Sequence, residues 1–150
     1  MMANHLLAST ALCLSAASCV PQSIDGARTA AANEVFARMD PSGALVDDAA
    51  DSYGVTSKGY RQVRGNGCLG LSADGLLFVP WTADQDELWI PIDHVLSADT
   101  TDAHLGKGKG RLLLRVRFVD EAGSEDSVAW AVKDPPRWVS TLHDARARPL

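Results

Sequence analysis

Short apolar runs separated by polar turns extend from Arg64 to Ser140, and they predict a series of β-strands. The clearest run is Arg111–Val119, where apolar side chains at every second position give one apolar strand face. Turn residues such as Asp74-Gly75, which favour a tight hairpin, separate the runs. Further runs lie at 68–71, 76–79, 88–92, 92–96 and 128–132. The pattern therefore predicts a mainly β protein with six or seven short antiparallel strands.

One amphipathic helix is predicted to follow the last strand. Asp134 is a good N-cap, and Pro135 suits the first helical position. Trp138, Val139 and Leu142 then fall on one side of the helix and form an apolar stripe. We expect this stripe to pack against the strands, with Trp138 directed inward.

Strands followed by one C-terminal helix with an inward tryptophan resemble the pleckstrin-homology-like (PH-like) superfold. The string RGNGCLGLSADGLLFVPW…ELWIPIDHV…HLGKGKGRLLLRVRF…DSVAWAVKDPPRW resembles bacterial PH-like domain proteins of unassigned function. The resemblance covers about Gly65 to His143. It implies a barrel of two near-orthogonal antiparallel sheets, capped by the C-terminal α-helix, with Trp138 plugging one end.

The resemblance also implies where a lipid headgroup would bind. Lipid-binding members carry a basic cluster in the loop between their first two strands. The loop expected to correspond here, Ser72–Gly75, is short and acidic. The resemblance therefore gives no support for phosphoinositide binding at that place.

At 150 residues, the chain has the length of one domain with a tail. Residues 64–148 are the predicted PH-like domain. Residues 33–63 are a lead-in segment, with a short helix at Asn33–Met39 and then a strand or a draped loop. Residues 1–32 are an apolar segment and a polar linker, the linker running from Pro21 to Ala32.

The apolar stretch from Leu6 to Val20 leaves two interpretations of the localisation open. It is too short for a transmembrane helix but has the length of a signal-peptide core. Ala17-Ser18-Cys19 resembles the end of a bacterial lipoprotein cleavage box, so the protein could be exported or membrane-anchored through Cys19. The favoured interpretation is a cytoplasmic protein with an Ala-rich extension. Membrane association is expected only through this segment.

The net charge and the cysteines exclude some classes of function. A net charge of −5 disfavours nucleic acid as a partner. The cysteines, Cys13, Cys19 and Cys68, match no zinc-ligand spacing. Cys68 lies in an apolar run, so we expect a buried thiol. The sequence predicts no metal and no cofactor.

A basic, glycine-rich segment is the first candidate contact site. Lys107, Lys109 and Arg111 lie in it, and Arg115 and Arg117 follow on the next predicted strand. The backbone of such a loop can hold a phosphate, although the spacing differs from that of a nucleotide-binding P-loop. The favoured interpretation is a solvated hairpin loop.

Trp89 is the second candidate contact residue. Trp130 and Trp138 fit core positions, whereas Trp89 alternates with its apolar neighbours and so faces the other side of its strand. Pro91 cannot donate a ladder hydrogen bond, which places this strand at an edge. Trp89 is therefore predicted either to contact a partner or to be covered by the N-terminal segment.

The sequence lacks catalytic motifs, such as a nucleophile elbow or a metal-ligand spacing, and we predict that it is not an enzyme. The leading hypothesis is a non-catalytic binding or scaffolding module that recognises a protein partner or another copy of itself. An anionic headgroup is a less favoured ligand. One alternative is a small β-barrel enzyme or small-molecule carrier with a pocket near Trp89 and His94. The other is an exported lipoprotein domain with an envelope role.

Overall fold

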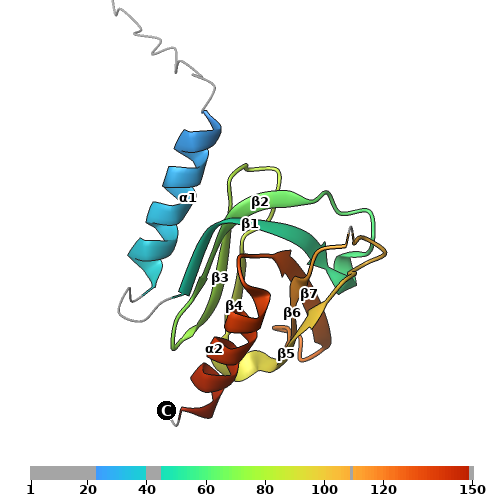
Figure 1. Ribbon diagram of the computed structural model, residues 1–150. Coiled ribbons are helices and arrows are strands. Elements are labelled where there is room, and N and C mark those ends of the chain that lie inside the picture. The colour runs from blue at the N-terminus through green and yellow to red at the C-terminus, as the bar shows by residue number, and fades with distance from the viewer. Residues whose placement is uncertain (1–22, 40–44, 109, 149–150) are drawn as a thin grey trace, which may run out of the picture.

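The computed structural model describes residues 23–39, 45–108 and 110–148 (Figure 1). The helices are α1 (Ile24–Arg38) and α2 (Pro135–Ala147), with short 3-10 helices η1 (Thr56–Lys58) and η2 (Ile92–His94). The strands are β1 (Leu45–Val55), β2 (Gly65–Leu71), β3 (Gly75–Pro80), β4 (Leu88–Pro91), β5 (Val95–Thr101), β6 (Leu113–Val119) and β7 (Glu125–Ala131).

The seven strands form one antiparallel sheet in the order β4-β3-β2-β1-β7-β6-β5. The predicted mainly β class with a C-terminal helix is therefore confirmed. The sheet is not closed into a barrel, because its edge strands β4 and β5 are joined through η2 and not by a ladder. It is continuous in the middle because β1 pairs with both β2 and β7.

The main core lies between the sheet and α2, which sits inside the curve of the strands (Figure 1). Trp138 and Leu142 of α2 are fully buried there, beside residues from both halves of the sheet such as Phe78 and Trp130. The Asp134 cap is present, since its Oδ1 accepts a hydrogen bond of 3.3 Å from the Arg137 amide. The predicted helix and the buried positions of Trp130 and Trp138 are confirmed.

β1 is the central strand of the sheet, so residues 45–55 are not a segment outside it. Of the two alternatives for this segment, the strand is therefore confirmed over 45–55 and the draped loop is wrong there. Its sequence, LVDDAADSYGV, shows no clear period of two, because two irregularities in its pairing interrupt the alternation of apolar side chains. Asp47 is buried, but its carboxylate accepts hydrogen bonds from the amides of Ala49 (3.0 Å) and Lys133 (2.6 Å). These bonds offset the cost of removing the charge from water.

α1 begins earlier than the sequence predicts, and the expected linker is wrong over residues 24–32. The Ser23 hydroxyl caps the helix by accepting a hydrogen bond of 3.1 Å from the Gly26 amide. One side of the helix carries Ala31, Val35 and Met39, which pack on the face of the sheet opposite α2. Their partners there are Cys68, Leu77 and Val79. Ala31, Val35 and Met39 therefore form a packing face.

The approach of α1 to the sheet is close at Gly70. A Cβ atom at this position would lie 2.6 Å from both Val35 Cγ1 and Met39 Sδ, which is closer than real contacts allow. Glycine at this point lets the helix rest directly on the backbone of β2. Within the described residues, neither α1 nor α2 is long and apolar enough to cross a membrane.

Candidate functional site

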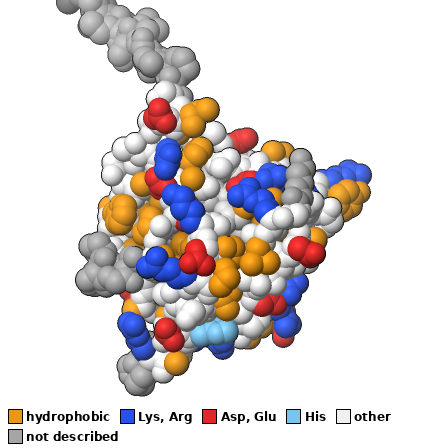
Figure 2. Space-filling model, viewed as in Figure 1, with side chains coloured by type: hydrophobic (Ala, Val, Ile, Leu, Met, Phe, Trp, Pro, Cys, Tyr) orange, Lys and Arg blue, Asp and Glu red, His pale blue; other side chains and the backbone are white. Residues whose placement is uncertain are grey.

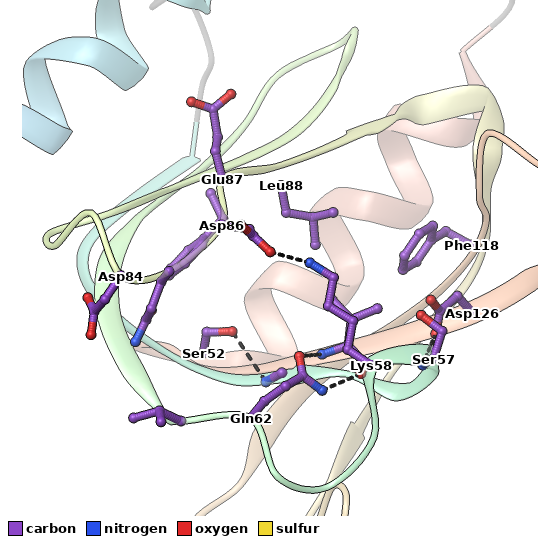
Figure 3. A pocket seen from close by; sticks show the side chains of 15 residues that line it. Ser52, Ser57, Lys58, Gln62, Asp84, Asp86, Glu87, Leu88, Phe118 and Asp126 are labelled. Atoms are coloured by element: carbon purple, nitrogen blue, oxygen red, sulfur yellow. Dashed lines mark hydrogen bonds and ion pairs between the residues drawn. The ribbon is translucent and has the colours of Figure 1, made fainter.

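A cleft of about 370 Å³ opens at one end of the sheet, where β1, β3, β4, β6 and β7 meet η1 and the β3–β4 loop (Figure 3). Its lining comprises Ser52, Gly54, Val55, Ser57, Lys58, Gln62, Val63, Phe78, Asp84, Gln85, Asp86, Glu87, Leu88, Phe118 and Asp126.

The apolar part of the cleft is an opening into the main core. Phe78 and Phe118 belong to the core cluster, and Val55 and Leu88 pack against it from partly buried positions. These side chains come from β1, β3, β4 and β6, so four strands contribute one apolar side chain each. Phe78 and Phe118 are only 3% and 6% exposed, so a ligand would remove apolar surface from water mainly at Val55 and Leu88.

An ion pair spans the cleft. Lys58 of η1 donates from its Nζ to the carboxylate of Asp86 in the β3–β4 loop (Figure 3). The two side chains are 50% and 80% exposed, so the pair is solvated and contributes little to stability. The hydrogen bond from Lys58, followed by its charge, lowers the pKa of Asp86.

Gln62 fixes the loop on the other side of the cleft. Its Nε2 donates to the carbonyls of Val55 and Gly59, both at 2.6 Å, and its Oε1 accepts from the Val55 amide at 2.9 Å. One side chain thus bonds both main-chain groups of the last residue of β1. This arrangement holds η1, and with it Lys58, beside the apolar surface.

The rim of the cleft is acidic. Asp86 is paired with Lys58, and Glu87 with Arg38 of α1 at 2.6 Å. Among the described residues, Asp84 accepts from the Thr82 hydroxyl and Asp126 from the amides of Ser57 (3.0 Å) and Ser127 (2.7 Å). These donors are neutral, so the negative charges of Asp84 and Asp126 remain uncompensated by a salt bridge.

Trp89 lies on β4, at an edge of the sheet, and is 43% exposed. It is paired with Leu77, and its ring lies over Gly75, where a Cβ atom would come within 2.9 Å of Trp89 Cη2. The expected exposure at a sheet edge is therefore present. Trp89 does not line the cleft. Its role as a partner contact stays a prediction.

The basic residues of the first candidate contact site are dispersed. Lys107 donates from Nζ to the Gln62 carbonyl at 2.5 Å, and Arg111 is exposed, while Lys109 lies outside the described residues. Arg115 forms two hydrogen bonds with Asp99, at 2.9 and 2.6 Å, and Arg117 pairs with Glu125 at 2.8 Å. On the face shown in Figure 2, positive and negative side chains are interspersed. Sequence reasoning missed both acidic partners because they come from neighbouring strands.

Neither His94 nor His104 lines the cleft, although His104 bonds Gly54, which does line it. A ring nitrogen of His94 bonds the Val119 carbonyl at 3.1 Å, and a ring nitrogen of buried His104 bonds the Gly54 carbonyl at 3.0 Å. Burial lowers the pKa of His104, which keeps the ring neutral. Since none of Trp89, His94 and His104 lines it, the cleft is not the pocket that the sequence placed near Trp89 and His94. In the described part of the chain, no group of three or more His, Cys, Asp or Glu side chains is placed to hold a metal ion.

The loop between the first two strands is residues 56–64, and the assignment of Ser72–Gly75 to this role is wrong. The error arises because the strands were counted from residue 68, whereas β1, which the sequence left open as a strand or a loop, is the first strand. The true loop carries Lys58, Arg61 and Arg64 and no acidic residue. Two of these cations are engaged, Lys58 with Asp86 and Arg64 with Asp51.

No family model matches the chain, and no curated protein matches it. A solved structure, described as the C-terminal domain of an unknown protein from Leishmania infantum, resembles it with a TM-score of 0.47 and 13% sequence identity. The match covers 80% of this chain and 98% of that chain. A likeness at this level carries no inference about function.

Proposed function

We propose that this chain is a non-catalytic binding module of the PH-like type and that it recognises a protein partner through the cleft. In this proposal, β1–β4 and β5–β7 act as the two sheets of the PH-like architecture, with α2 as the cap. The core supports it, because α2 packs against residues from both halves. The resemblance of the strand and helix order to PH-like domains supports it as well.

One observation carries the proposed function: the open apolar surface at the base of the cleft. Val55, Leu88 and the 76% exposed Val63 give a partner an apolar surface, and the nearly buried Phe78 and Phe118 line the same cleft from the core. Covering such a surface supplies about 25 cal/mol for each Å² removed from water. A rim of polar groups around an apolar centre is the usual composition of a protein interface.

A small-molecule carrier is the second candidate function, and the volume of the cleft favours it. About 370 Å³ falls within the range typical of small-ligand sites, roughly 300–1,000 Å³.

Lipidation at Cys19 and a cytoplasmic location are both retained as predictions, since residues 1–22 lie outside the described part.

The experiment that separates the two candidates is site-specific photocrosslinking in cells. A photoreactive phenylalanine replaces Val63, which lines the cleft and is 76% exposed, and the matched control carries it at Ser140 on α2. We expect a protein adduct of defined mass from position 63 and none from position 140. The adduct should disappear when Leu88→Lys places a charge in the apolar base, with folding checked by circular dichroism. Equal adducts from both positions, or no protein adduct from position 63, would contradict the proposal.

A further inference from the structure

We infer that the cleft binds a protein segment in which one large apolar side chain is flanked on both sides by lysine or arginine. This inference rests on the proposed function and specifies its partner.

The charges that line the cleft determine the sign of the charge that a partner should carry. Four carboxylates line it, those of Asp84, Asp86, Glu87 and Asp126, against the single ammonium of Lys58. Lys58 is already engaged by Asp86. An anionic ligand would meet an excess of negative charge, whereas a cationic one would be attracted and guided to the cleft.

The positions of the uncompensated carboxylates determine where the partner's charges lie. Asp84 and Asp126 lie on opposite sides of the cleft, with Leu88 and Lys58 between them (Figure 3). A side chain that packs on Leu88 therefore has a carboxylate on either side. Cationic residues before and after the apolar residue can each approach one of them.

Hydrogen bonds within the protein prepare the Asp126 carboxylate for this role. Its Oδ1 accepts from the Ser57 and Ser127 amides, so the side chain is held in place before a partner arrives. Oδ2 has no hydrogen-bond partner among the described residues. A guanidinium or an ammonium can therefore bind it without breaking an existing bond.

Peptide binding followed by NMR tests the inference. The probe is an acetylated, amidated Ser-Arg-Lys-Phe-Lys-Arg-Ser peptide, and two further peptides replace either the central Phe by Ser or the four cations by Glu. We expect the first peptide to shift the methyl signals of Val55, Val63 and Leu88. The Ser and Glu peptides should bind at least about tenfold more weakly, since each lacks one of the two required features.

Protein variants provide the matched comparison. Asp84→Asn combined with Asp126→Asn keeps the hydrogen-bond acceptors and removes two negative charges. We expect this double variant to bind the Phe peptide with an affinity about tenfold or more below that of the unmodified protein. Asp102→Asn combined with Asp144→Asn makes the same change in net charge at exposed positions that do not line the cleft. This control should bind as the unmodified protein does.

Each other outcome overturns the inference in a distinguishable way. If the Glu peptide binds in the cleft as well as the basic one, the charge rule is wrong while the proposed function stands. If the Ser peptide binds equally well, or if the control variant loses as much affinity, only non-specific attraction exists. If no peptide shifts the cleft signals while Val63 still crosslinks to a protein, the partner has another chemistry. If neither occurs, the proposed function fails too.

Discussion

Cys68 illustrates how one side chain is set by its surroundings. It lies on β2 beneath α1 and is fully buried. Burial, followed by the nearby charges of Asp48 and Asp47, raises the pKa of its thiol from 9.0 to about 12. The thiol is therefore protonated, and it has the buried, unreactive character that the sequence predicted.

This pKa shift predicts a loss of stability at alkaline pH. The unfolded thiol ionises near pH 9 and the folded one only near pH 12, so the stabilisation is complete below pH 9 and is lost between these values. Across that interval, the free energy of unfolding of the protein that keeps Cys68 should fall by about 1.4 kcal/mol more per pH unit than that of the Cys68→Ala variant. Urea unfolding of both proteins from pH 8 to 10.5 measures this, with Cys13→Ser and Cys19→Ser in each. Parallel curves would contradict the assignment.

Sequence reasoning at single positions succeeded where the environment is mostly local. Cys68, Trp130 and Trp138 lie at apolar positions of regular elements, and all three are buried as predicted. It failed where a partner comes from another strand, as with Asp99 beside Arg115. Register across a sheet depends on pairing between distant segments, which a single strand sequence does not record.

α1 is the element whose attachment is easiest to change. It is held by Val35 and Met39 on the sheet, and by ion pairs from Arg28 to Asp48 and from Arg38 to Glu87, each at 2.6 Å. The ion pairs are exposed and contribute little to the free energy that holds α1 on the sheet. The apolar contact therefore decides how often the helix detaches.

Val35→Ala should loosen α1 without unfolding the sheet. It removes two buried methyl groups, which costs about 1–3 kcal/mol of docking free energy. Cys68 lies under the helix, so its reaction with a disulfide reagent at pH 8 should accelerate by about tenfold or more. The measurement uses the Cys13→Ser, Cys19→Ser background.

Phe36→Ala is the matched control on the same helix. Phe36 is exposed, so its removal should change the stability by less than about 0.5 kcal/mol and leave the Cys68 reaction rate unchanged. Equal acceleration in both variants would mean that Cys68 becomes accessible through another motion.

The elements differ in how well the sequence predicts them. The β2–β3 hairpin and α2 carry local signals, namely the Asp74-Gly75 turn and the Asp134-Pro135 cap. β1 carries three aspartates and two irregularities, so its period of two is obscured. The first half of α1 resembles a linker because the buried residues of the helix, Ala31 and Val35, begin only near its middle, so residues 24–30 show no apolar stripe.

Considered across the whole protein, Trp138 and Trp89 differ in their contribution to stability. Trp138→Ala empties the centre of the core and should lower the free energy of unfolding by about 3–5 kcal/mol. Trp89→Ala changes a 43% exposed side chain and should cost about 1 kcal/mol or less. Urea unfolding followed by far-ultraviolet circular dichroism compares the two. Similar losses would show that Trp89 is part of the core.

The cleft could not be predicted from the sequence, because its residues come together only through the order of the strands. Its lining comes from residues between 52 and 126, and no local motif connects them. Three of its contributors, Ser52, Gly54 and Val55, lie on β1, a segment that the sequence left open as a strand or a draped loop. A site assembled from strand ends depends on the topology of the sheet, so it appears only once the order of the strands is known.

The place of β1 also has a consequence for how the chain folds. β1 to β4 follow one another as neighbours, and so do β5 to β7, but the pairing of Ser52 with Trp130 joins the two groups across most of the chain. Closing so long a loop costs conformational entropy before the contacts between β1 and β7 can form. We therefore expect the pairing of β1 with β7 to be the slow step of folding. A chain that started at Gly65 would leave β2 and β7 with open edges, which invites aggregation.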